Sequence, residues 1–186
     1  MGVTWDEYLQ AADLDEISIA AQKLQELAGL EDSQGLEADL MVASRLYVIR
    51  GELEYGSNES AWYLMQSLIT EHELLPACSP AWLSRVHQWY GNVLGRYGEH
   101  AAAALSFEKA AETREYGYSG SAMAPYLFNS ASSSALLAGA SEWAYELALR
   151  SLNHMEKYPA VLDMEDGPRH RKEAVRCLSR SKLTVD

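Results

Sequence analysis

The histidines are the side chains of this sequence best suited to catalysis or metal binding. There are five of them, at positions 72, 87, 100, 154 and 170. Two have acidic neighbours, in Glu71-His72-Glu73 and in His170-x-x-Glu173, and such groups could hold a metal ion. However, no histidine has the Glu three residues earlier that di-iron helical bundles use, and no His-Glu-x-x-His pair occurs. We therefore interpret both clusters as solvated helix ends and expect no metal and no cofactor.

A nucleophilic serine is the second chemistry to test. Gly117-Tyr118-Ser119-Gly120-Ser121 places a serine among glycines, but the second Gly of a nucleophile elbow is missing and no strand precedes the segment. We interpret it as a loop between helices. Acidic groups such as Asp13/Asp15 and Asp163/Glu165/Asp166 lie near turns, where helix capping or solvation explains them. The sequence therefore predicts a protein without catalytic residues, not an enzyme.

Charge and composition narrow the class of partner. The 186 residues include 15 Lys and Arg against 27 Asp and Glu, a net charge of −12 that would repel a phosphate backbone or an anionic membrane. No apolar run approaches the ~20 residues of a membrane helix, and the first residues resemble no signal peptide. Cys78 and Cys177 are too few for a disulfide framework or a zinc site. We expect a cytoplasmic protein with reduced thiols and no direct nucleic acid or membrane partner.

The elements that would position these side chains are expected to be helices. Ala, Leu, Glu and Gln are abundant, and no strand-like alternation of useful length occurs. Three segments align on a Gly that is followed five positions later by an Ala, as Gly56 with Ala61, Gly98 with Ala103, and Gly139 with Ala144. The glycines lie 42 and 41 positions apart, and apolar residues around them follow helical spacings. Each unit is predicted to be a helix, a turn with a left-handed Gly, and a second helix.

The stretch from Ser84 to Thr113 resembles a tetratricopeptide (TPR) motif. The motif's Gly, Gly, Ala, aromatic residue and Ala correspond to Gly91, Gly98, Ala103, Phe107 and Ala110. The units around Gly56 and Gly139 share part of this set. The pitch exceeds the common 34 residues and is similar to that of kinesin light chains and of bacterial TPR proteins, although no heptad coiled coil precedes the repeats.

The resemblance implies an all-α solenoid of helix-turn-helix repeats. It would contain about nine antiparallel helices wound into a right-handed superhelix, in a single domain over residues 1–186. We expect an atypical helix pair in residues 1–35, three repeats in 40–157 and a capping helix in 167–182. The units must stack because a single helix pair cannot bury its apolar face alone.

The resemblance also implies a concave groove lined by the first helix of each unit. The residues expected there are Tyr47, Arg50, Arg85, Gln88, Trp89, Asn92, Arg96, Tyr126, Asn129 and Ser133. Asn suits backbone amides, Arg suits carboxylates and aromatic rings suit apolar side chains, so this set favours a peptide that carries acidic and aromatic residues. The family's clamp for a chain-end carboxylate is not expected, because Gln88 stands where it needs a Lys. Alternatively, Trp89 and Tyr126 belong to the core and the arginines pair along their own helices.

Three functions follow from this interpretation. The leading hypothesis is an adaptor or scaffold that holds a peptide or protein segment in its groove. A second is a ligand-sensing regulatory module that acts through a partner protein, and a third is a small secretion or assembly chaperone. The oligomeric state stays open.

Overall fold

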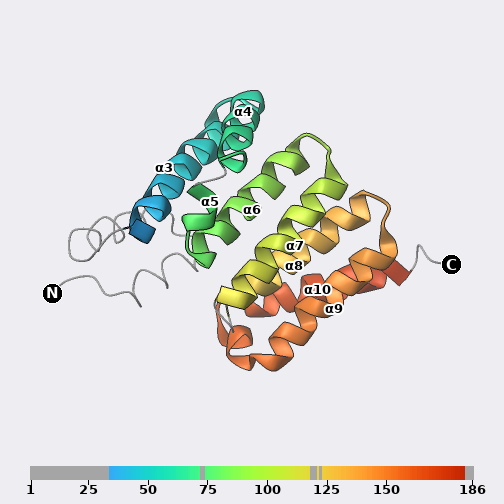
Figure 1. Cartoon of the computed structure of the whole chain (residues 1–186). Coiled ribbons are helices and arrows are strands. Elements are labelled where there is room, and N and C mark those ends of the chain that lie inside the picture. Colours follow the sequence, from blue (N-terminus) through green and yellow to red (C-terminus); the bar gives the residue numbers. More distant parts are fainter. Residues whose placement is uncertain (1–33, 72–73, 118–120, 122, 183–186) are drawn as a thin grey trace.

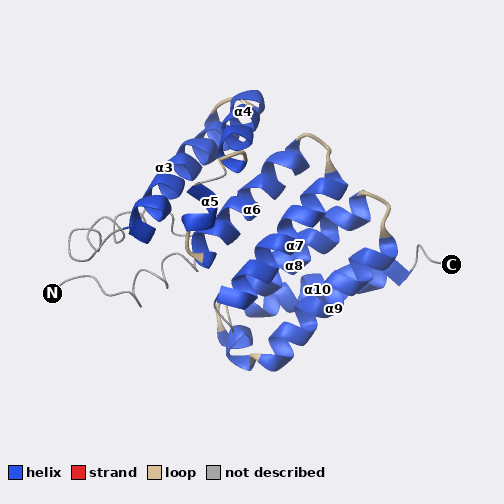
Figure 2. Ribbon diagram, in the orientation of Figure 1, coloured by secondary structure: helices blue, strands red, loops and turns tan. Residues whose placement is uncertain are grey.

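The computed structural model describes residues 34–71, 74–117, 121 and 123–182, and this part of the chain is helical without any strand (Figures 1 and 2). Its elements, in chain order, are α3 (Gln34–Tyr55), α4 (Asn58–Ile69), α5 (Leu74–Ala77), α6 (Pro80–Arg96), α7 (His100–Gly117), α8 (Met123–Leu137), α9 (Ser141–Lys157), the 3-10 helix η1 (Pro159–Asp163) and α10 (Gly167–Lys182). The all-α class is thus confirmed. The helix pair expected in residues 1–35 lies almost wholly outside the described residues.

From α6 onward, each helix packs mainly against its neighbours in the chain. In Figure 1, α6, α7, α8 and α9 lie side by side in chain order, and α10 packs against both α9 and α8. The first helices form a smaller group, in which α3 contacts α4, α5 and α6. Turns of three residues join α6 to α7 and α8 to α9, so these pairs run antiparallel. The range of α10 equals that expected for the last helix.

Two of the three repeat glycines have the conformation expected of a helix-ending turn. Gly98 and Gly139 both have φ of +78°, a left-handed backbone that L side chains rarely adopt. Gly56 is different, because it is not among the glycines with positive φ. A Cβ atom there would instead lie 2.3 Å from the carboxylate of Glu52, which accepts the Ser57 N–H at 3.1 Å. The prediction of a left-handed Gly is therefore wrong in the first unit, where a close approach explains the glycine.

The core of the middle unit depends on a close approach between α6 and α7. A Cβ atom on Gly91 would lie 2.9 Å from Cε1 of Phe107, so the ring occupies the space that any other residue would need. Ala103 and Ala110 are fully buried beside it. Two large apolar clusters, one around α3, α4 and α6 and one around α7, α8 and α9, share the partly buried Trp62 and Tyr90.

Pro80 and Pro76 lie at different places in their helices. Pro80 is the first residue of α6, where its missing N–H is tolerated, but the Ser79 side chain makes no capping hydrogen bond. The Ser79 N–H instead donates to Asp39 Oδ1 at 2.7 Å. Pro76, by contrast, lies inside the short α5. No helix in the described ranges is long and apolar enough to span a membrane.

Candidate functional site

A cleft of about 400 Å³ opens between α8 and the first half of α10. On α8 it is lined by Met123, Tyr126, Asn129, Ser130 and Ser133, and on the other side by Asp166, Arg169, His170 and Glu173. Both sets follow helical spacings of three and four, so each forms one face of its helix. The cleft therefore exists because α10 packs against α8 as well as against α9.

Asn129 is the central polar residue of this cleft. It is 4% exposed, and its Nδ2 donates to the His170 backbone carbonyl at 2.9 Å. Its carbonyl Oδ1 is buried and accepts no hydrogen bond from any described residue. A buried acceptor without a donor is disfavoured by about 1–3 kcal/mol. Asn129 thus joins the two helices while keeping one strong acceptor unused.

The rings of Tyr126 and His170 form the apolar part of the wall. Their centroids are 5.6 Å apart with a tilt of 59° between the ring planes. Burial lowers the pKa of His170, and Arg169 lowers it further while Asp166 partly opposes them. The imidazole is therefore neutral at pH 7, and the wall presents aromatic surface without a positive charge.

The charged side chains at the cleft are bound only loosely to one another. Arg169 Nη1 is 3.9 Å from Asp166 Oδ1, and Arg176 Nη1 is 3.6 Å from Glu173 Oε2. All four side chains are at least 41% exposed, so water screens both pairs. Among the lining residues, two carboxylates face a single guanidinium, and Arg176, beside the lining, is the partner of the second carboxylate.

The cleft brings together three of the ten groove residues predicted from the sequence. Tyr126, Asn129 and Ser133 all line it from α8. Tyr47 and Arg96 are exposed, and Arg50 and Asn92 are partly buried, but none of these four reaches the cleft. The sequence-based set is therefore distributed along the helices, and only its third-unit members share a concave site.

Three residues of α6 that were expected to line an accessible groove are buried instead. Arg85 is 1% exposed and donates to Gln88 Oε1 at 2.9 Å, and Gln88 and Trp89 are buried as well. At helical spacing these positions face the core of the stack, so their side chains are not presented to a partner. Arg50 pairs with Glu54 at 2.7 Å. The argument for an acidic ligand thus loses two of its three arginines.

The α10 side of the cleft was missed by sequence reasoning. Arg169, His170 and Glu173 lie on one face of α10 and Asp166 directly precedes that helix, and this spacing is readable in the sequence. Its partner face on α8 is not readable, because nothing local specifies that the two helices meet. His170 and Glu173 were considered as metal ligands, but no group of three ligating side chains that could hold a metal occurs in the described ranges. His72 and Glu73 lie outside them.

A second hollow of about 690 Å³ lies over α6 and α7, beside the end of α4 and α5. Its lining includes Ile69, Tyr90, Leu105 and His87. Burial lowers the pKa of His87 to about 4, and the nearby Lys109 contributes. The hollow follows from helix length, since α4 has 12 residues whereas α7 has 18 and α9 has 17.

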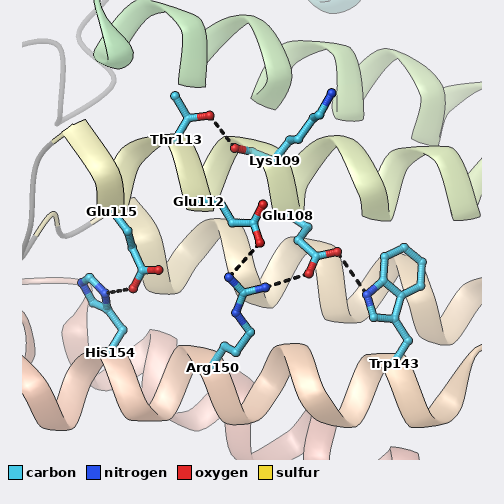
Figure 3. A network of polar contacts seen from close by, with 8 residues as sticks. All are labelled: Glu108, Lys109, Glu112, Thr113, Glu115, Trp143, Arg150 and His154. Carbon is cyan, nitrogen blue, oxygen red and sulfur yellow. Dashed lines mark hydrogen bonds and ion pairs between the residues drawn. The ribbon is translucent and has the colours of Figure 1, made fainter.

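Unlike the hollow over α6 and α7, the space between α7 and α9 is bridged by polar contacts (Figure 3). Arg150 donates to Glu108 at 2.7 Å and to Glu112 at 3.0 Å, and its guanidinium lies 4.4 Å from the ring centroid of Phe128. The Trp143 indole N–H donates to Glu108 at 3.1 Å. Buried His154 contacts Glu115 at 2.7 Å through Nδ1 and the Ser121 carbonyl at 3.1 Å through Nε2. These contacts fix α9 against α7 across α8.

No protein-family model matches this chain, and no curated protein matches it either.

Proposed function

We propose that this protein is a non-catalytic adaptor that binds a peptide or protein segment at the face formed by α8 and α10. The observation that carries the proposal is that Tyr126, Asn129 and Ser133, predicted as ligand contacts from their repeat positions, line one cleft together. The cleft is concave, partly apolar and contains an unused buried acceptor, as expected of a recognition site.

A TPR-like solenoid is the architecture that best accounts for the helix arrangement. Three observations support it: the packing of each helix from α6 to α10 on the next, the left-handed Gly98 and Gly139 turns, and the contact of Gly91 with Phe107. In such a stack each unit lends its neighbour the apolar surface that a single pair lacks.

The chemistry of the cleft favours binding over catalysis. Its carboxylates lie on the exposed side with arginines nearby, and the neutral His170 packs against Tyr126. No nucleophile paired with a base lines it. The proposed adaptor works in the cytoplasm, and its charge of −12 disfavours nucleic acid as a direct partner.

A ligand-sensing regulatory module is the second candidate, because one observation favours it. The cleft volume of about 400 Å³ is within the ~300–1,000 Å³ typical of small-molecule sites. A molecule that bridges α8 and α10 would hold the last helix at one angle to the stack, and a partner protein could respond to that angle. A secretion or assembly chaperone is the third candidate and would use the same face for a longer segment.

The adaptor proposal can be tested by selection from a random 12-residue peptide display library. The baits are the wild type, Ser130→Trp, which fills the cleft, and Ser179→Trp as the control. The two serines are matched, since each donates only to the carbonyl four residues earlier in its own helix, at 3.0 Å, and Ser179 does not line the cleft.

Peptides that bind the wild type and Ser179→Trp but not Ser130→Trp would support the adaptor proposal. Circular dichroism would first establish that all three baits have the same helix content and melting temperature. If no peptide is enriched on the wild type, or if Ser130→Trp retains every enriched peptide, the proposal is overturned. Enrichment of small metabolites from an extract, lost in the same variant, would favour the ligand-sensing module.

A further inference from the structure

We infer that the α8–α10 cleft binds a guanidinium group, the side chain of an arginine in a basic segment of the partner. This inference rests on the proposed peptide-binding function and assigns the partner's chemistry, which is opposite in charge to that suggested by the sequence alone. The inference follows from the hydrogen-bond acceptors that remain in the cleft, from the two carboxylates of its lining and from the aromatic rings of its wall.

Two donors of the α8 wall are already used inside the protein. The Ser130 hydroxyl donates to the Tyr126 carbonyl at 3.0 Å, and the Asn129 amide donates to the His170 carbonyl at 2.9 Å. Ser133 Oγ hydrogen bonds with Cys177 Sγ at 3.6 Å, and either atom can be the donor. A ligand that only accepts hydrogen bonds would therefore depend mainly on the Tyr126 hydroxyl and on Arg169 of the opposite wall.

The acceptors, by contrast, are free or weakly engaged. Asn129 Oδ1 is buried and receives no hydrogen bond from the described residues. The carboxylates of Asp166 and Glu173 stand on the opposite wall, and their nearest arginine nitrogens are 3.9 Å and 3.6 Å away. A ligand with several N–H donors would satisfy Asn129 and reach a carboxylate at the same time. Because such a ligand must donate in more than one direction, a single hydroxyl or amide is a poor match.

The wall and the charge select a guanidinium among the groups that donate. Tyr126 and His170 present adjacent aromatic rings 5.6 Å apart, and a flat delocalised cation stacks on such surfaces better than an ammonium does. Its five N–H donors lie in one plane, which allows contact with Asn129 Oδ1 and with a carboxylate together. Burial keeps His170 uncharged, so it does not repel the cation. The net charge of −12 further attracts basic segments from a distance.

The test starts from the peptides selected on the wild type in the display experiment. The sequences are examined for Arg, and the most enriched peptide is synthesised twice, once as selected and once with its Arg replaced by citrulline, which keeps the shape but has no charge. Isothermal titration compares both peptides on the wild type, on Glu173→Gln and on Glu142→Gln. Glu142 is an exposed residue of α9 that does not line the cleft, so its variant is the matched control.

We expect Arg at one fixed position of the enriched peptides, and a loss of roughly tenfold or more in affinity for the citrulline peptide. Glu173→Gln should weaken the Arg peptide several-fold and leave the citrulline peptide nearly unchanged, and Glu142→Gln should affect neither. Glu173 is partly exposed, so its variant is expected to fold. Cleft-dependent peptides that lack Arg, or equal affinity for Arg and citrulline, would overturn this inference while leaving the adaptor proposal intact. No enriched peptide at all would overturn both.

Discussion

Arg150 of α9 donates to Glu108 of α7 at 2.7 Å, across the intervening helix α8. Its guanidinium also lies 4.4 Å from the ring centroid of Phe128, which belongs to α8, so one side chain of α9 contacts both preceding helices. Glu108 is 21% exposed and also accepts from Trp143. This contact joins two helices that are not consecutive in the chain, so it can form only when α7, α8 and α9 are packed together.

The Arg150–Glu108 pair should be more strongly coupled than a surface pair. In a double-mutant cycle with Arg150→Ala and Glu108→Ala, we expect a coupling free energy of about 1 kcal/mol, because the pair is partly buried and belongs to a network. The i,i+4 pair Arg50–Glu54 on α3 is the control and should give about 0.3–0.5 kcal/mol. Urea unfolding of the single and double variants measures both. Equal coupling in the two cycles would show that the network adds nothing.

The contact of Gly91 with Phe107 should make even a methyl group destabilising. Gly91→Ala places a carbon 2.9–3.0 Å from the ring, and the resulting shift should lower the free energy of unfolding by about 1–3 kcal/mol. Gly95→Ala, one turn later in α6, meets nothing within 4 Å and should raise it by about 0.5–1 kcal/mol through helix propensity. Urea unfolding should give opposite signs for the two variants. Stabilisation by both would mean that the ring moves aside without loss.

The left-handed turns should be equally specific for glycine. Gly98→Ala and Gly139→Ala should each reduce the free energy of unfolding by about 1–2 kcal/mol, since φ of +78° brings Cβ too close to the following carbonyl. The reason is conformational, as no atom lies within 4 Å of either Cβ position. Gly51→Ala within α3 also meets open space and is the control that should be neutral or stabilising. Thermal melts in which all three variants behave alike would contradict the assignment.

These glycines also show how far the sequence predicts the molecule. The Gly-to-Ala spacing predicted the helix pairs and two of the three turn conformations, because a left-handed turn imposes a local requirement that one residue meets. It predicted Gly56 wrongly, because a helix end can also be set by a side chain such as Glu52, and the residue type alone does not distinguish the two causes.

Only one side of the candidate site could be predicted from the sequence, because the other side depends on tertiary packing. Tyr126, Asn129 and Ser133 followed from their repeat positions, whereas the facing residues depend on the tertiary contact of α10 with α8. Arg85 and Gln88 share a helix face in any register, but whether that face meets solvent or core depends on neighbours far along the chain. Periodicity therefore predicts which residues share a face, while packing decides which faces are open.

His87 should make the stability depend on pH between about 6.5 and 4. Burial lowers the pKa of His87 to about 4 in the folded protein, so within this window the unfolded chain binds more protons. The free energy of unfolding should therefore fall as the pH drops from 6.5 towards 4, by about 2 kcal/mol once partial exposure is considered. His87→Gln should remove this part of the slope. Urea unfolding at pH 7, 6, 5 and 4.5 tests it, and identical slopes in the variant and the wild type would refute it.

Cys78 should be an unreactive thiol in the folded protein. Burial and, to a smaller extent, the charge of Asp39 together raise the pKa of Cys78 to about 12, so almost no thiolate exists at pH 8. Iodoacetamide should modify Cys78 roughly a hundredfold more slowly in the folded protein than in urea, as followed by peptide mass spectrometry. Asp39→Asn should speed the modification without changing the fold appreciably. Equal rates in folded protein and urea would contradict the assigned environment.

The packing of each helix on its neighbours also determines the order in which the parts of this molecule can fold during synthesis. Substantial contacts in the described ranges join elements that lie no more than three apart along the chain, and such local contacts favour rapid, stepwise folding. During synthesis, α6 and α7 can pair soon after Gly117 leaves the ribosome. Asn129 must wait for His170, which is made 41 residues later. We therefore expect the candidate site to be the last part to form, so that a chain interrupted before α10 would have a folded core but no α8–α10 cleft.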